Sequence, residues 1–128
     1  MNAKDLFLNW GMLLIGVITN VMGMYLVKMK MNELGGIDVS SMKMALGYFL
    51  LLLRSPLAMI GAILFIIAPF PYAVAISRME LSLAYPLSIA LSCLIIVPLT
   101  FIFFGESITF NKIAAIAMIL VSLYFLYR

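Results

Sequence analysis

Two polar side chains interrupt or end the first long apolar stretch of this chain, and both could bind a ligand. Asn20 places an amide inside an uncharged run that extends from Leu6 to Val27, and Lys28 follows eight residues after Asn20. On a helix that spacing is a little over two turns, so the two side chains lie not far from one face. Asn20 either pairs two helices or lines a cavity for a polar headgroup. Lys28 either holds a phosphate as a point charge or extends to a membrane interface.

Tyr25, Tyr85 and Ser88 are further candidates for substrate binding. A tyrosine can stack on a sugar or hydrogen-bond a lipid headgroup, although tyrosines also anchor helices at membrane interfaces. Ser88 is the middle member of a row of small residues spaced four apart, Ala84, Ser88 and Ser92. Such a row lets another helix backbone approach closely.

The charged candidates for substrate binding lie between apolar stretches. Arg78 and Glu80 separate two of them, and Glu106 follows a third within the sequence Phe-Gly-Glu-Ser. Each also has a simpler explanation. Arg78 and Glu80 suit a solvated turn, and a carboxylate such as Glu106 is favoured near the positive N-terminal end of a helix dipole.

The side chains that support catalysis and metal binding are scarce. The chain has no His and one cysteine, Cys93, which lies in an apolar run. The usual zinc sites and general bases therefore have no ligands here. Ser82 and Ser88 have no histidine to activate them, and no phosphate-binding glycine loop is present. We expect no enzymatic activity, no catalytic residue, no cofactor and no metal.

The composition indicates that these residues are positioned by membrane helices. With 66% hydrophobic and 10% charged residues and a mean hydropathy of +1.23, the chain has too little polar surface to enclose a water-soluble core. We expect an all-α integral membrane protein with one domain over residues 1–128. Its net charge of +3 suits loops and lipid headgroups, so we expect no nucleic-acid partner.

Four stretches are long enough to cross a bilayer, which takes about 20 apolar residues. The predicted spans are residues 6–27, 55–77, 81–105 and 107–127. Charges and glycines after residue 27 predict a loop. Residues 39–54 have apolar positions at spacings of three and four, which predicts an amphipathic helix in the membrane surface. Prolines are expected to kink the second and third spans, at Pro69, Pro71, Pro86 and Pro98.

Positive charges are divided almost evenly between the two sides of this arrangement. Five lie in the first loop, the surface helix and the third turn, and three lie at the termini and the second turn. The larger number favours a cytoplasmic first loop by a small margin. Insertion in both directions, with antiparallel pairing of two copies, therefore stays open.

Three motifs are similar to those of a known group of transporters. They are Asn-Val-Met-Gly-Met-Tyr-Leu-Val-Lys at residues 20–28, Leu-Ser-Leu-Ala-Tyr-Pro-Leu-Ser at 81–88, and Phe-Gly-Glu-Ser at 104–107. Together they resemble the drug/metabolite transporter superfamily. The four-helix size resembles the small multidrug resistance proteins. The Ala-Tyr-Pro signature and Glu106 resemble the EamA-like branch, and most of all the flippase subunits for undecaprenyl-phosphate-linked aminoarabinose.

This resemblance implies a transporter, with one departure that affects the substrate. Where the multidrug exporters carry a membrane-embedded glutamate, three residues before Gly23, this chain has Asn20. An amide neither titrates nor balances a cationic drug, so Asn20 and Lys28 favour an anionic or neutral ligand. The resemblance implies a flippase that moves a polyprenyl (undecaprenyl) phosphate-linked sugar across the bacterial inner membrane. It also implies a homodimer, or a heterodimer with a related small subunit.

Two other functions stay open at the level of sequence. One is a proton-coupled exporter of small cationic compounds, for which Glu80 and Glu106 would have to replace the absent acid. The other is a non-transporting partner subunit of a glycolipid pathway, which the small-residue row would suit.

Overall fold

The computed structural model describes residues 2–128, which form helices and no strand. The elements in chain order are α1 (Ala3–Leu6), the π-helix η1 (Phe7–Gly11), α2 (Met12–Leu34), α3 (Met42–Arg54), α4 (Pro56–Ile67), α5 (Pro69–Ile76), α6 (Leu81–Phe104) and α7 (Phe110–Tyr127). They build four helical stretches that are long and apolar enough to cross a membrane, namely Ala3–Leu34, Pro56–Ile76, Leu81–Phe104 and Phe110–Tyr127. The expected all-α architecture with four apolar helices is confirmed.

The first of these helices is longer at both ends than residues 6–27. It continues through the predicted loop to Leu34, where Gly35 ends it with a φ of 84°. Charged residues are compatible with a helix, and here two of them form an ion pair along it. Lys30 Nζ lies 2.6 Å from Glu33 Oε2, one turn further along. The prediction that a loop follows directly after residue 27 was therefore wrong.

Proline interrupts the second apolar helix but not the third. The second divides at Ala68 into α4 and α5, because Pro69 has no amide hydrogen to continue the helical hydrogen bonding and takes the first position of α5 instead. In contrast, α6 is one uninterrupted helix that includes Pro86 and Pro98. Of the two proline-containing spans, only the second is thus divided at a proline.

The connection between α6 and α7 is longer than expected. Gly105 ends α6 in the left-handed conformation, with a φ of 63°, and α7 begins only at Phe110, where the Thr109 hydroxyl accepts a hydrogen bond from the Lys112 amide (3.4 Å). Glu106 therefore lies in the loop between the two helices. It does not lie at a helix start, as one sequence interpretation had it.

The segment predicted to be a surface helix is α3. It begins at Met42, three residues later than expected, because the Ser41 side chain accepts a hydrogen bond from the Met44 amide (3.2 Å) and caps it. The Tyr48 hydroxyl donates to the Gly35 carbonyl (2.8 Å) and so joins α3 to the end of α2. Its apolar side chains Met42, Leu46, Phe49, Leu50 and Leu53 are exposed.

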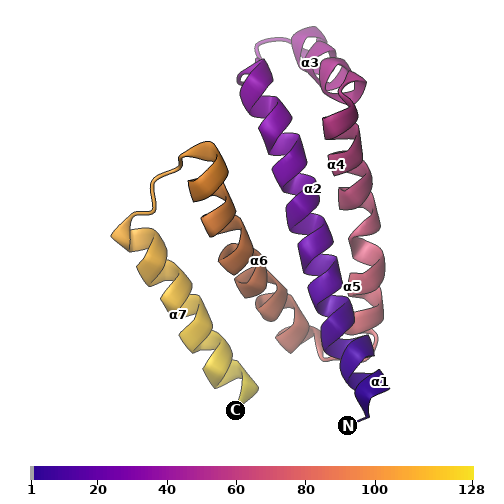
Figure 1. Ribbon diagram of the computed structural model, residues 1–128, viewed down its shortest axis with the longest axis vertical. Helices are drawn as coiled ribbons and strands as arrows, with labels where there is room; N and C mark the ends of the chain where they lie inside the picture. Colours follow the sequence, from indigo (N-terminus) through magenta and orange to yellow (C-terminus); the bar gives the residue numbers. More distant parts are fainter. Residues whose placement is uncertain (1) are drawn as a thin grey trace.

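Helix α2 is the centre of the molecule and packs against α4, α5 and α6, whereas α7 packs against α6 (Figure 1). A Cβ on Gly23 would lie 2.7 Å from the Gly61 carbonyl oxygen, so the backbones of α2 and α4 are in direct contact. A small core of Leu13, Ala75 and Ala84 joins α2, α5 and α6 nearer the termini. Both termini lie at the same end of the bundle (Figure 1).

Candidate functional site between α2, α5 and α6

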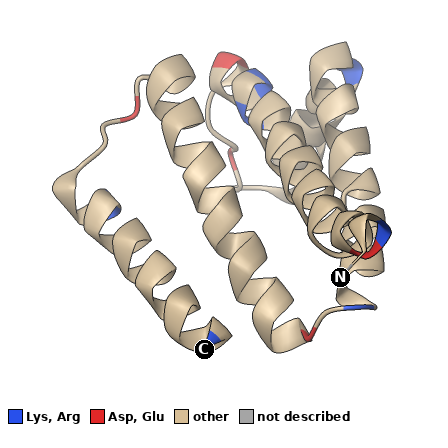
Figure 2. Ribbon diagram, turned by 60° about the horizontal axis from the view of Figure 1, so that its bottom comes forward, with Lys and Arg blue, Asp and Glu red and all other residues tan. Residues whose placement is uncertain are grey.

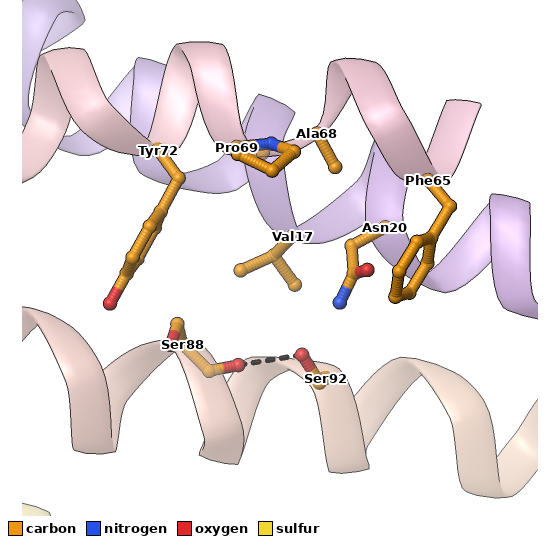
Figure 3. Close-up of a pocket in the computed structure, with 9 residues that line it drawn as sticks. Val17, Asn20, Phe65, Ala68, Pro69, Tyr72, Ser88 and Ser92 are labelled. Carbon is orange, nitrogen blue, oxygen red and sulfur yellow. Dashed lines mark hydrogen bonds between the residues drawn. The ribbon is translucent and has the colours of Figure 1, made fainter. Parts of the chain in front are cut away.

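A cavity of about 200 Å³ lies where α2, the α4–α5 junction and α6 meet. Three of the four apolar helices contribute to its walls, and α7 does not (Figure 3). Its lining residues are Gly16, Val17, Asn20, Phe65, Ala68, Pro69, Tyr72, Ser88 and Ser92. Asn20 lies near the middle of the 32-residue helix Ala3–Leu34, so the cavity is far from both ends of that helix.

Two local features of the chain create this cavity. Gly16 lets α5 approach α2 closely, because a Cβ there would lie 3.1 Å from the Tyr72 amide nitrogen and 3.3 Å from the Ala68 carbonyl oxygen. The interruption at Ala68 starts a new helix at Pro69. Tyr72 then follows within the first turn of α5 and directs its ring toward α6 (Figure 3).

The polar groups of the cavity differ in how their hydrogen bonds are used. The Ser88 hydroxyl donates to the Tyr85 carbonyl and the Ser92 hydroxyl to the Ser88 carbonyl, both at 2.7 Å. Both serine hydroxyls therefore donate their hydrogen within α6 and can only accept a hydrogen bond from a ligand. The Tyr72 hydroxyl oxygen is buried and has no hydrogen-bond partner among the described residues. The Asn20 amide points from α2 toward α6 (Figure 3).

A second group of candidates meets at the other end of α2. Lys28 Nζ lies 3.9 Å from Glu106 Oε1 in the α6–α7 loop. One turn earlier, the Tyr25 ring packs on Phe103 and Phe104 at centroid distances of 5.5 and 5.4 Å. Residues far apart in the sequence thus join α2 to the end of α6. Lys28 also borders a hollow of about 370 Å³ with Met31, Asn32, Gly35 and Gly36.

The remaining candidates lie apart from both groups. Tyr85 is 58% exposed and borders a shallow hollow with Leu81, Ser82 and Pro86. Arg78, in the turn between α5 and α6, lies 3.8 Å from Asp5 of α1. Glu80 precedes α6, where its backbone carbonyl accepts the amides of Leu83 and Ala84. The structure therefore brings Asn20 and Ser88 together, and Lys28, Tyr25 and Glu106 together, but leaves Tyr85, Arg78 and Glu80 outside these groups.

Two polar residues of the cavity were not among the sequence candidates. Tyr72 and Ser92 line it beside Asn20 and Ser88. Ser92 belongs to the row of small residues on α6, which faces α2 and α5. Tyr72 carries a hydroxyl group and lies one position after Pro71 within an apolar run. A polar side chain at such a position was the feature of the sequence that could have indicated it.

The cavity contains no carboxylate, and no group of three or more His, Cys, Asp or Glu side chains forms within residues 2–128. The charged residues lie near helix ends and in connecting segments (Figure 2). No protein-family model, curated protein or solved structure matches this chain. A function must therefore be argued from the residues of the two groups and their geometry.

Proposed function

We propose that this chain is a multi-pass protein of the bacterial inner membrane that moves a polyprenyl-phosphate-linked sugar from the cytoplasmic to the outer leaflet. Four helices of sufficient length and apolarity support the membrane assignment. The position of the charged residues near helix ends supports it as well (Figure 2). In this arrangement α3 lies in the membrane surface with its exposed apolar side chains in lipid.

The observation that carries the proposal is that α2 both lines an uncharged polar cavity and carries a lysine. Asn20 lines the cavity, and Lys28 follows eight residues later on α2. This separation corresponds to a rise of about 12 Å along the helix. A sugar in the cavity and its phosphate near Lys28 would use both groups. The isoprenoid tail would remain in lipid, since the outer faces of the helices are apolar and exposed.

Lys28 is available for such a phosphate because its present partner holds it loosely. The distance of 3.9 Å between Lys28 Nζ and Glu106 Oε1 is longer than a hydrogen bond of about 2.7–3.2 Å. A phosphate with several acceptor oxygens would replace this carboxylate at little cost. Glu106 then acts as the group that occupies Lys28 when no lipid is bound.

The transporting unit in this proposal contains two chains, either two copies or this chain and a related small subunit. Helix α7 packs on α6 and leaves many large apolar side chains exposed, among them Phe110, Met118, Tyr124 and Phe125. A second chain would enclose the translocation path. The alternative of proton-coupled cation export lacks comparable support, because none of the residues that line the cavity is a carboxylate.

The first test measures transbilayer movement of a fluorescent polyprenyl-phosphate sugar in liposomes that contain the purified chain. We expect Lys28→Ala to lower the rate about tenfold or more, since hydrogen bonds to charged groups contribute about 1.5–3 kcal/mol. Lys30→Ala is the matched control, because Lys30 lies on the same helix but pairs with Glu33. Its rate should equal that of the wild type.

Three results of this test have different consequences for the proposal. Equal rates for Lys28→Ala and the wild type would exclude Lys28 as the phosphate ligand. No lipid movement by the wild type would exclude a flippase that acts alone. Movement that begins only after a second subunit is added would identify the chain as one half of a heterodimer.

A further inference from the structure

The hydrogen-bonding groups of the cavity form a small set that carries no charge. Asn20 provides an amide with donors and an acceptor, Tyr72 provides a hydroxyl, and Ser88 and Ser92 provide hydroxyl oxygens whose hydrogens are already donated. The other lining residues are apolar or glycine. This set complements a ligand that both donates and accepts hydrogen bonds, as a sugar hydroxyl does.

All five acidic residues of the chain lie away from this cavity. Asp5 and Glu106 pair with Arg78 and Lys28, and Glu33 pairs with Lys30. Asp38 lies in the loop before α3 and Glu80 in the turn before α6. An amino sugar would bring an ammonium group into the cavity without a carboxylate to balance it, which is costly in an apolar setting. A neutral sugar has no such cost.

Tyr72 has a hydroxyl group that lacks a hydrogen-bond partner within residues 2–128, and a ligand would provide one. Its hydroxyl oxygen is buried, lacks a partner among the described residues and points toward Ser88 on α6 (Figure 3). A buried hydroxyl without a hydrogen bond is unfavourable, and it is rare in folded proteins unless a ligand or water satisfies it. The volume of about 200 Å³ exceeds that of one water molecule, which occupies about 30 Å³ in the liquid.

We infer that this cavity selects an uncharged, hydroxyl-rich sugar over an amino sugar, and that Tyr72 is a specificity-determining residue for it. The inference rests on the proposed transport of a polyprenyl-phosphate-linked sugar and names the class of that sugar. It assigns the Tyr72 hydroxyl and the Asn20 amide as the donors to the sugar oxygens. Ser88 and Ser92 accept from the sugar hydroxyls.

The test compares three fluorescent lipids in liposomes that contain the full chain: polyprenyl phosphate bearing glucose, the same lipid bearing 4-aminoarabinose, and bare polyprenyl phosphate. The wild type should move the glucose lipid faster than the amino-sugar lipid. Tyr72→Phe keeps the ring and removes the hydroxyl. It should slow the glucose lipid about three- to tenfold, the effect of one lost hydrogen bond, and leave the bare lipid unchanged. Tyr127→Phe, at the exposed end of α7, is the matched control and should change none of the three.

A second variant tests whether the absence of a carboxylate from the cavity disfavours an amino sugar. Asn20→Asp places a carboxylate in the cavity, so it should shift the preference toward the amino-sugar lipid. Unfolding of each variant in detergent serves as the folding control. Because the Tyr72 hydroxyl has no protein partner, Tyr72→Phe should unfold at the same temperature as the wild type or above it.

The outcomes separate this inference from the transport proposal. An unchanged ratio of glucose-lipid to bare-lipid rates in Tyr72→Phe, or faster movement of the amino-sugar lipid by the wild type, would overturn the inference while transport stands. Movement of none of the lipids would exclude transport by two copies of this chain without a further subunit. In that case, binding of the glucose lipid in detergent would test the inference about Tyr72. The fluorescence of Trp10, the single tryptophan, would report this binding. Glucose-lipid affinity that is the same in Tyr72→Phe and the wild type would overturn the inference as well.

Discussion

Lys28 and Glu106 form an ion pair whose strength is limited by water. The two side chains are 51% and 40% exposed, and their charged atoms are 3.9 Å apart. Exposed pairs of this kind contribute about 0–1 kcal/mol to stability. The pair therefore connects α2 to the α6–α7 loop without locking them together.

Neutralising Glu106 should consequently have little effect on folding. We expect Glu106→Gln to change the free energy of unfolding by less than about 1 kcal/mol, because the lost attraction is screened by solvent. Chemical unfolding in detergent micelles, followed by circular dichroism, measures this change. A loss of several kcal/mol would mean that the pair organises the loop, contrary to this expectation.

At the scale of elements, the contact between α2 and α4 depends on two glycines. A Cβ on Gly61 would lie 2.8 Å from the Gly23 carbonyl oxygen and 2.9 Å from Leu26 Cβ. These distances are too short for any side chain, so the two helices meet backbone to backbone. Close contacts of this type are the main source of helix association in lipid, where apolar burial provides little driving force.

Substitution of one of these glycines should separate the helices. Gly23→Ala forces its Cβ against backbone atoms of Gly61 and Phe65, and we expect a loss of about 1–3 kcal/mol from overpacking. Gly47→Ala is the matched control, since a Cβ there meets no atom within 4 Å. Within helix α3 it should stabilise by about 0.5–1 kcal/mol. Unfolding midpoints that move in the same direction for both variants would contradict this packing argument.

The whole molecule has both termini at one end and the α2–α3 and α6–α7 connections at the other (Figure 1). Four apolar helices that alternate in direction produce this result, because an even number of them returns the chain to its starting end. The end with the two connections carries Lys28, Lys30, Lys43, Arg54 and Lys112, and the opposite end carries Lys4, Arg78 and Arg128. The difference of two charges gives a slight bias in orientation.

Tags on the two termini should therefore report the same side of the membrane. We expect N-terminal and C-terminal tags to be cleaved by an external protease to the same extent in sealed vesicles. Partial cleavage of both, to equal fractions, would indicate insertion in two directions. Cleavage of one tag and protection of the other would contradict four spans.

Much of the helical architecture could be predicted from the sequence alone, because a long apolar run in lipid forms a helix without help from distant residues. Helix boundaries were predicted less accurately than the presence of the helices. Helix α2 continues past Lys28 because the Lys30–Glu33 pair and Gly35 act over one or two turns, and a hydropathy pattern does not detect such contacts. The single break at Ala68, and the uninterrupted α6, likewise depend on local hydrogen bonding around each proline.

By itself, the sequence determined that the chain is helical, that four of its helices are apolar enough for a membrane, and that Asn20 and Lys28 are its unusual polar residues. Tertiary structure alone decided that Tyr72 and Ser92 join Asn20 at one cavity, and that Glu106 meets Lys28. The physical reason is that these contacts depend on how each helix is rotated and how closely it packs. Gly16, Gly23 and Gly61 set that packing through contacts between residues distant in the chain.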